Sequence, residues 1–374
     1  MQPCHTLFNG MLRASIAVAL LLPPSFAQQV PAPGQPSLAW YNLAKLSVEG
    51  KGWPKTKNLY DRLPASAEGI VREPVWNLSQ DSAGLRYRFI TDADSVYARW
   101  KLRKPRLAMP HMAATGVSGL DLYVRDGTKW HWLAVGRPEN PEVNEATLVA
   151  GLRRGSREYM LYLPLYNGVD SVEIGLPEGA TFEPAPDRYR AMKPVVFYGT
   201  SILQGGCAAR PGMAYPSIIG RMLDEPTINL GFSGNGKMEP EIAKLLAELD
   251  PSAYVLDSLP NLNVAETTER LAPFVRTLRA VHPLTPIVFV ENVTYSNAPY
   301  LDDRRARVSD VNALLRREYD KMAAAGDRNV YYVPTSQLLG ADGEDTVDGT
   351  HPTDLGFIRM AQGIAPAVAK ALQK

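Results

Sequence analysis

The second half of the chain alternates short apolar runs with amphipathic segments, and this alternation limits the fold more than any other feature. The first run, P-V-V-F-Y-G at residues 194–199, has no polar break, which is typical of a strand covered on both faces. Four further runs share this character: T-I-N-L-G-F, A-Y-V-L-D, P-I-V-F-V-E-N-V and N-V-Y-Y-V-P. Helical segments separate them at residues 214–223, 240–249, 267–281 and 304–325, and a last helix starts at Thr353. Strands alternating with helices predict a parallel, doubly wound α/β sheet.

Residues 38–176 follow a different pattern, with apolar side chains at every second position between turn residues. In G-L-R-Y-R-F-I-T, for example, Leu85 and Tyr87 share one face and Arg86 lies on the other. The stretch from G-L-D-L-Y to W-L-A-V is typical of a hairpin that turns at Asp126–Gly127. Many short strands without a long helical period predict an all-β sandwich.

The change of pattern predicts two domains, a sandwich over residues 30–185 and a catalytic domain over residues 190–374. The proline-rich stretch at residues 183–194 is the predicted linker between them. Large aromatic side chains in a sandwich are expected in its core, with stacking against sugars as the alternative. All six tryptophans lie in the first half: Trp40, Trp53, Trp76, Trp100, Trp130 and Trp132.

Residues 1–27 have the layout of a secretory signal peptide, with a weakly basic start, a short apolar core and small residues before a cleavage site after Ala27. We therefore expect an exported protein, either secreted or periplasmic. Cleavage would remove Cys4 and leave Cys207 without a partner for a disulfide. The formal net charge of +1 gives no reason to expect a nucleic-acid partner. No later segment approaches the roughly 18 apolar residues that a membrane helix needs.

Polar residues follow the predicted parallel strands, at the sheet edge where such folds place their chemistry. Ser201 comes after the first strand, and Asp348 and His351 stand in D-G-T-H after the fifth. A hydroxyl, an imidazole that accepts its proton and a carboxylate that orients the imidazole are the groups that nucleophilic acyl transfer requires. The alternative is that Ser201 caps one helix, while Asp348, Thr350 and Thr353 cap the last one.

Two further loops could supply hydrogen-bond donors. Gly234 lies in G-F-S-G-N-G after the second strand, and Asn261 lies in L-D-S-L-P-N-L-N after the third. Without a Cβ, Gly234 allows its N–H to approach a substrate, and the Asn261 amide can donate a second hydrogen bond. Together with the Ser201 N–H they predict a three-donor oxyanion hole. Taken singly, a glycine or an asparagine in a loop is more often a turn former.

These residues stand in four ordered blocks that resemble those of the SGNH (GDSL-type) hydrolase superfamily: G-T-S-I at 199–202, N-L-G-F-S-G at 229–234, D-S-L-P-N at 257–261 and D-G-T-H at 348–351. G-T-S replaces the usual G-D-S, and L-P-N-L stands in place of G-x-N-D. Both departures resemble a subgroup in which G-T-S-I-x-Q-G-G is followed by R-P-G-M-A-Y, as at 199–215 here. In that subgroup a β-sandwich with a G-x-D-L-Y motif precedes the catalytic domain, and G-L-D-L-Y stands at 119–123.

The resemblance implies a flavodoxin-like sheet of five parallel strands after a jelly-roll-like sandwich. It implies that Ser201 is the nucleophile, that Asp348 and His351 complete the triad, and that Ser201, Gly234 and Asn261 form the oxyanion hole. It also implies ester hydrolysis without a metal or another cofactor. In agreement, no second histidine or cysteine falls at ligand spacing along the chain from Asp348 and His351.

Exported members of the subgroup often deacetylate polysaccharides, so the resemblance predicts a short-chain acyl esterase, acetyl foremost, acting on a polysaccharide or oligosaccharide. A broad-specificity esterase or lysophospholipase acting on lipid or small-molecule esters remains an alternative. A non-catalytic carbohydrate-binding protein on a hydrolase scaffold is a second alternative. The expected partner is an acylated carbohydrate or another small ester, without nucleic acid or membrane insertion. The sequence carries no sign of the oligomeric state.

Overall fold

The computed structural model describes residues 37–373. The predicted signal peptide and Cys4 lie outside this range. Within it, no helix combines the length and apolar character that crossing a membrane requires. The described residues from Leu38 onward form one compact unit. The predicted boundary between a domain at 30–185 and a domain at 190–374 stays a prediction.

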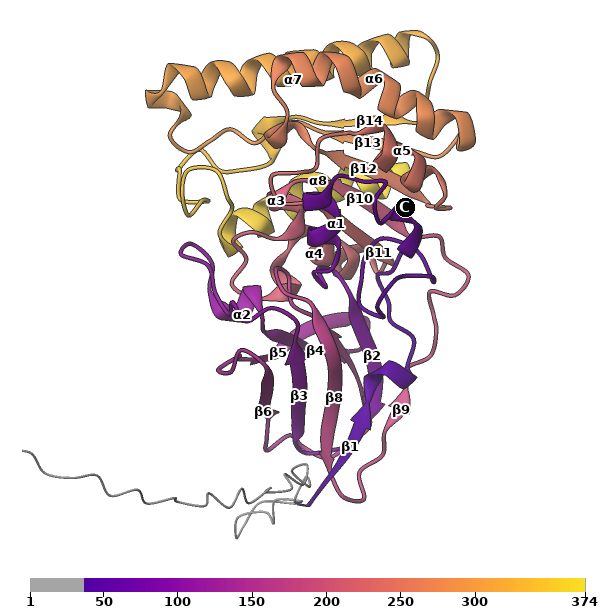
Figure 1. The fold of residues 1–374 in the computed structure, drawn as a ribbon, viewed down its shortest axis with the longest axis vertical. Coiled ribbons are helices and arrows are strands. Elements are labelled where there is room, and N and C mark those ends of the chain that lie inside the picture. The colour runs from indigo at the N-terminus through magenta and orange to yellow at the C-terminus, as the bar shows by residue number, and fades with distance from the viewer. Residues whose placement is uncertain (1–36, 374) are drawn as a thin grey trace, which may run out of the picture. The chain divides into compact units, whose positions relative to one another are not determined.

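The first half of the described chain folds into two antiparallel sheets, as the period-two pattern predicts (Figure 1). The first sheet has the order β1 (Leu38–Asn42), β8 (Val169–Pro177), β3 (Val96–Leu102), β6 (Val143–Val149). The second has the order β5 (Lys129–Gly136), β4 (Leu120–Asp126), β7 (Arg157–Tyr162), β2 (Arg86–Thr91), β9 (Glu183–Pro184). Inward side chains such as Tyr87, Trp100 and Leu122 form one buried core. The hairpin between β4 and β5 turns at Gly127 (φ +57°), where the sequence predicts it.

The outward face of β2 is also covered, which its alternating sequence does not reveal. Arg86 and Arg88 are 3% and 5% exposed. Both guanidinium groups pair with Glu49, at 3.2 and 2.6 Å, and Arg88 also pairs with Glu158 at 2.6 Å. Buried arginines of this kind need such partners because an unpaired buried charge is costly.

The second half forms the predicted parallel five-stranded sheet. Its order is β11 (Thr227–Gly231), β10 (Val195–Gly199), β12 (Ala253–Asp257), β13 (Ile287–Val290), β14 (Val330–Val333). Numbered along the chain this is 2-1-3-4-5, the flavodoxin-like order. All side chains of β10, β11 and β12 are buried, in agreement with strands covered on both faces.

Helices cover both faces of the parallel sheet (Figure 1). The described helices are α1 (Glu73–Ser79), α2 (Ala114–Val117), α3 (Ser201–Gln204), α4 (Tyr215–Leu223), α5 (Pro240–Ala247), α6 (Val264–Val281), α7 (Asp302–Ala324) and α8 (Asp354–Ala371). α5 and α6 share a core with Val196 and Tyr198, whereas α4 and α8 share one with Val195 and Phe197. α6 begins earlier than predicted because Asn263 and Glu266 form a capping box.

The tryptophans divide between the two halves. Trp100 is in the sandwich core, as expected. Trp53 and Trp76 are also buried, but they pack in the core that α5 and α6 share with the parallel sheet. The Trp53 indole N–H donates to Glu248 at 2.9 Å. Trp132 is 49% exposed, so the expected core role is wrong for this residue.

Two motifs that are separate in the sequence meet in the fold. Asp121 of G-L-D-L-Y is fully buried and accepts hydrogen bonds from Arg210 at 2.9 Å and from the Gly212 N–H at 2.8 Å, both in R-P-G-M. Tyr123 stacks under the Arg221 guanidinium, 4.1 Å from its ring centroid. The two motifs therefore join the sandwich to the loop that follows the Ser201 turn.

Candidate active site

Ser201 occupies the first position of α3, directly after β10. The helix cap is Thr200, whose Oγ1 accepts from the Ile202 N–H at 3.3 Å, so the Ser201 hydroxyl does not serve as the cap. Gly199 makes the turn possible, because a Cβ there would lie 2.1 Å from the carbonyl oxygen of Asp257 in the neighbouring β12. Ser201 is thus held in a tightly packed strand end and is 8% exposed.

The Ser201 hydroxyl contacts His351, and His351 contacts Asp348. Ser201 Oγ lies 2.9 Å from His351 Nε2, and His351 Nδ1 lies 2.8 Å from Asp348 Oδ2. Asp348 Oδ1 accepts from the backbone N–H groups of His351 at 2.8 Å and Thr350 at 3.0 Å. These partners assign the hydrogen to Nδ1 and leave Nε2 as the acceptor facing Ser201. None of these contacts caps α8.

The loop that carries Asp348 and His351 closes on itself. The Thr353 N–H donates to the Asp345 carbonyl at 2.7 Å, and the Val347 N–H donates to the His351 carbonyl at 2.9 Å. Gly349, with φ +87°, provides the left-handed residue between the carboxylate and the imidazole. This closed loop holds both side chains in place before any substrate binds.

The pKa values of Asp348 and Cys207, two groups near His351, are shifted in opposite directions. Partial burial opposes ionisation of Asp348, but hydrogen bonds from the His351 backbone and ring outweigh it and lower the Asp348 pKa to about 2. Asp348 is therefore a carboxylate at neutral pH. Burial, reinforced by the nearby Asp348 charge, raises the pKa of the Cys207 thiol to about 12. Cys207 is consequently protonated near pH 7 and is a poor nucleophile.

The loop after β11 carries Gly234 in a left-handed conformation with φ +69°. Gly234 is exposed, and a Cβ at this position would meet no heavy atom within 4 Å, so the left-handed φ rather than a steric limit favours glycine here. The neighbouring Ser233 N–H donates to Gln204 Oε1 at 3.0 Å. Gln204 also donates to the Leu165 carbonyl at 3.0 Å, which ties the loop to the sandwich half.

Asn261 lies in the turn after β12. Assigned from its hydrogen-bonding surroundings, its Oδ1 accepts from the backbone N–H groups of Asn235 at 3.0 Å and Gly236 at 3.2 Å. The Nδ2 group is on the other side of the amide carbon, so its hydrogens point away from those backbone donors. Asn261 therefore joins the turn after β12 to the loop that carries Gly234.

Several neighbours of the site are not evident in the sequence pattern. The Tyr166 hydroxyl, from the first half of the chain, donates to the Ser201 carbonyl at 3.1 Å. His111 and Cys207 place ligand atoms within 4.8 Å of each other and of His351. Neither residue falls at ligand spacing from His351 along the chain, so the sequence pattern could not show that the fold brings them together. Among the residues that support the site, Gln204 could have been found from the sequence, because it is the glutamine of the G-T-S-I-x-Q-G-G motif.

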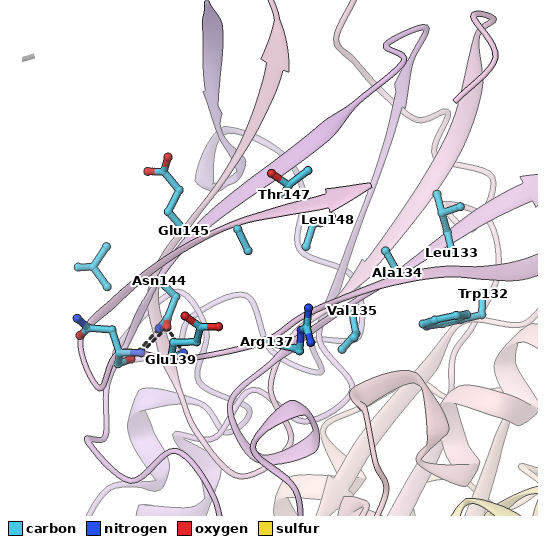
Figure 2. A pocket seen from close by; sticks show the side chains of 13 residues that line it. Trp132, Leu133, Ala134, Val135, Arg137, Glu139, Asn144, Glu145, Thr147 and Leu148 are labelled. Carbon is cyan, nitrogen blue, oxygen red and sulfur yellow. Dashed lines mark hydrogen bonds between the residues drawn. The ribbon is translucent and has the colours of Figure 1, made fainter. Parts of the chain in front are cut away.

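Two grooves in the described residues lie apart from Ser201. The larger, about 790 Å³, runs between β5 and β6 on the sandwich, and Figure 2 shows its lining side chains, among them Trp132, Arg137 and Asn144. The smaller, about 460 Å³, is lined largely by α7 residues. Neither groove is lined by Ser201 or His351.

Comparison with known proteins identifies the family. The model of the GDSL-like lipase/acylhydrolase family matches residues 192–369, and a model for the N-terminus of SGNH-hydrolase-type esterases matches residues 38–182. A protein from Bacteroides ovatus described as a GDSL-like lipase has 35% sequence identity and a TM-score of 0.85, covering 90% of this chain and 98% of its own. The chain belongs to the GDSL-like, SGNH-type hydrolase family. As a member of this family it is an esterase.

More distant structures share the fold of this esterase. Salicylyl-acyltransferase SsfX3 from a tetracycline biosynthetic pathway has 21% identity and a TM-score of 0.66, with coverage of 91% of this chain and 96% of its own. A family two carbohydrate esterase from Cellvibrio japonicus has 14% identity and a TM-score of 0.57, with coverage of 91% and 99%. Comparison with curated proteins gives no match.

Proposed function

We propose that this esterase is exported and removes short acyl groups, acetyl foremost, from a polysaccharide or oligosaccharide through an acyl-enzyme on Ser201. The observation that carries the proposal is the unbroken hydrogen-bonded chain from Ser201 Oγ to His351 to Asp348, with distances of 2.9 and 2.8 Å. An acyl-transfer enzyme needs these three groups in this order.

In the proposed cycle, His351 Nε2 takes the Ser201 proton while Oγ attacks the ester carbonyl carbon. The N–H groups of Ser201 and Gly234 and the Asn261 Nδ2 group donate to the oxyanion. When the tetrahedral intermediate collapses, the carbon–oxygen bond to the alcohol breaks and the alcohol takes the proton from His351. Water, deprotonated by His351, then attacks the acyl-enzyme and releases the acid. Asp348 stays ionised throughout and stabilises the imidazolium.

Exposure of the site favours a substrate that presents its acyl group from a larger body. The His351 and Asp348 side chains are 24% and 40% exposed, so the acyl group can be reached without a tunnel. The half-exposed Trp132 in the β5–β6 groove adds an aromatic surface of the kind on which sugar rings stack. The fold shared with the Cellvibrio japonicus carbohydrate esterase is consistent with this class of substrate.

The test compares the rates of hydrolysis of esters that differ in the length of the acyl chain and in the alcohol to which it is bound. We expect faster hydrolysis of 4-nitrophenyl acetate than of the octanoate, and acetate release from acetylated xylan or xyloglucan. Ser201→Ala should lose activity and labelling by a fluorophosphonate, while Ser233→Ala, an exchange in the adjacent loop, should retain labelling. Full activity of Ser201→Ala would contradict the mechanism. Preference for octanoyl esters without release of acetate from glycans would contradict the proposed substrate and favour a lipid-ester hydrolase.

A further inference from the structure

Two side chains that the proposed mechanism does not use lie beside His351. His111 is at the tip of the turn Met109–Met112, whose end residues exchange backbone hydrogen bonds at 3.0 and 3.1 Å. Cys207 is buried in the loop after α3, and its N–H donates to the carbonyl of Pro352 at 3.2 Å. One ligand atom from each of His111, Cys207 and His351 lies within 4.8 Å of the other two. The two imidazole rings are 5.6 Å apart between centroids.

Two imidazoles and one thiol are a ligand set that suits Zn²⁺ and related cations. In a tetrahedral zinc site, metal–nitrogen and metal–sulfur distances of about 2.0 and 2.3 Å place two nitrogens and one sulfur about 3.3–3.5 Å apart. The observed limit of 4.8 Å therefore requires the ligand atoms to approach one another by up to about 1.5 Å. His111 is an exposed side chain on a turn, so it has the freedom to make that movement.

The surroundings of His351 resemble those of a metal-bound histidine. Its Nδ1 is held by Asp348 at 2.8 Å, which leaves Nε2 as the atom for a cation. A carboxylate on the far nitrogen is the usual outer partner of a zinc-bound imidazole, because it fixes the tautomer and raises the basicity of the ligand. Water or the Ser201 hydroxyl, 2.9 Å from Nε2, is placed to complete the coordination.

We propose that His111, Cys207 and His351 form an inhibitory binding site for a thiophilic divalent cation of the Zn²⁺ class. Binding replaces the Cys207 thiol proton, which is released to solvent, by a metal–sulfur bond. It also occupies the Nε2 lone pair of His351 that would otherwise accept the Ser201 proton. The inhibitory part rests on the proposed function of His351, whereas the binding part does not.

Binding is tested on the purified full chain with Cd²⁺ and Co²⁺. We expect one equivalent of metal to produce the thiolate-to-metal charge-transfer absorption in the ultraviolet. Cys207→Ser should remove this absorption, and His111→Ala should weaken binding by at least about tenfold, because loss of even an outer partner of a metal ligand costs about 10- to 100-fold in affinity. His131→Ala, which removes an exposed histidine on β5, is the matched control and should bind like the unaltered protein. Absence of the absorption, or its persistence in Cys207→Ser, would overturn the site.

Inhibition is tested with Zn²⁺ in the 4-nitrophenyl acetate assay. We expect loss of activity with added Zn²⁺ and recovery with EDTA. His111→Ala and Cys207→Ser should retain basal activity and need at least about tenfold more Zn²⁺ for half inhibition. If Cys207→Ser does not fold, as judged by circular dichroism, His111→Ala on the surface decides. Equal Zn²⁺ sensitivity in His111→Ala and His131→Ala would refute inhibition at this site.

The outcomes of these experiments distinguish a failure of the metal site from a failure of the proposed function. A metal-dependent absorption that is lost in Cys207→Ser, in a protein without esterase activity, would uphold the binding site and contradict the proposed function. An active enzyme that shows no absorption and no Zn²⁺ inhibition would uphold the proposed function and refute the metal site.

Discussion

In the proposed mechanism the Asn261 amide oxygen accepts hydrogen bonds from the loop that carries Gly234, and its Nδ2 group donates to the oxyanion. Replacing Asn261 with aspartate keeps the first role and removes the second. Aspartate keeps an oxygen that can accept from the Asn235 and Gly236 N–H groups, now 3.0 and 3.2 Å away, so two hydrogen bonds worth about 1 kcal/mol each are retained. The exchange removes the Nδ2 donor. Loss of one oxyanion donor costs about 100- to 1,000-fold in kcat, or about 2.7–4 kcal/mol. We expect at least this loss, because the new carboxylate also repels the developing oxyanion.

Steady-state kinetics with 4-nitrophenyl acetate and thermal unfolding followed by circular dichroism measure the two roles. Asn261→Asp should keep nearly the original Tm. Asn261→Ala should lose similar activity and also about 2 kcal/mol of stability, because both accepted hydrogen bonds disappear. Asn263→Asp is the control, since it adds the same charge two residues away at the N-cap of α6, where aspartate caps as well as asparagine. An unchanged kcat in Asn261→Asp, or an equal loss in Asn263→Asp, would refute the donor role.

Three further exchanges test how the site is supported. Burial raises the pKa of Asp257 to about 7 from 3.8, so the fold loses stability as pH rises through this range. In thermal unfolding, Asp257→Asn should therefore be more stable than the parent protein by up to about 4 kcal/mol at pH 8 and by less than about 1 kcal/mol at pH 4. Gly236→Ala should reduce soluble yield sharply, because a Cβ there would lie 1.9 Å from the Gly199 carbonyl oxygen, and a soluble, active variant would contradict this packing. Asp121→Ala should cost about 2 kcal/mol in urea unfolding, since it removes the oxygen that accepts from Arg210 and from the Gly212 N–H, and an unchanged midpoint would show that these contacts contribute little.

The positions of Ser201, Asp348 and His351 at one edge follow from the strand pattern. Each residue comes directly after a strand or in the loop beyond it, and parallel strands place their carboxyl ends together. The blocks around Gly234 and Asn261 follow in the same way. The alternative that Ser201 caps a helix could not be decided from the sequence, because Thr200 is an equally good cap and only the coordinates show which hydroxyl serves.

Contacts between segments that are far apart in the sequence could not be predicted from the strand pattern. An alternating strand predicts that Arg86 faces away from the sandwich core, but not that Glu49 covers it there. Trp132 has a large aromatic side chain of the kind expected in a core, yet it lies on an edge strand beside a groove. Periodicity reports which face of an element a side chain occupies, and it carries no information on which other element comes to lie against that face.

The amino-acid sequence by itself determined the two kinds of sheet and the places of Ser201, Asp348 and His351 after predicted strands, because strand periodicity and turn residues act locally along the chain. Tertiary packing alone decided that His111 and Cys207 approach His351. These neighbours come from segments far apart in the chain, and their distances depend on how the sandwich docks through Asp121 and Arg210 against the loop after the serine.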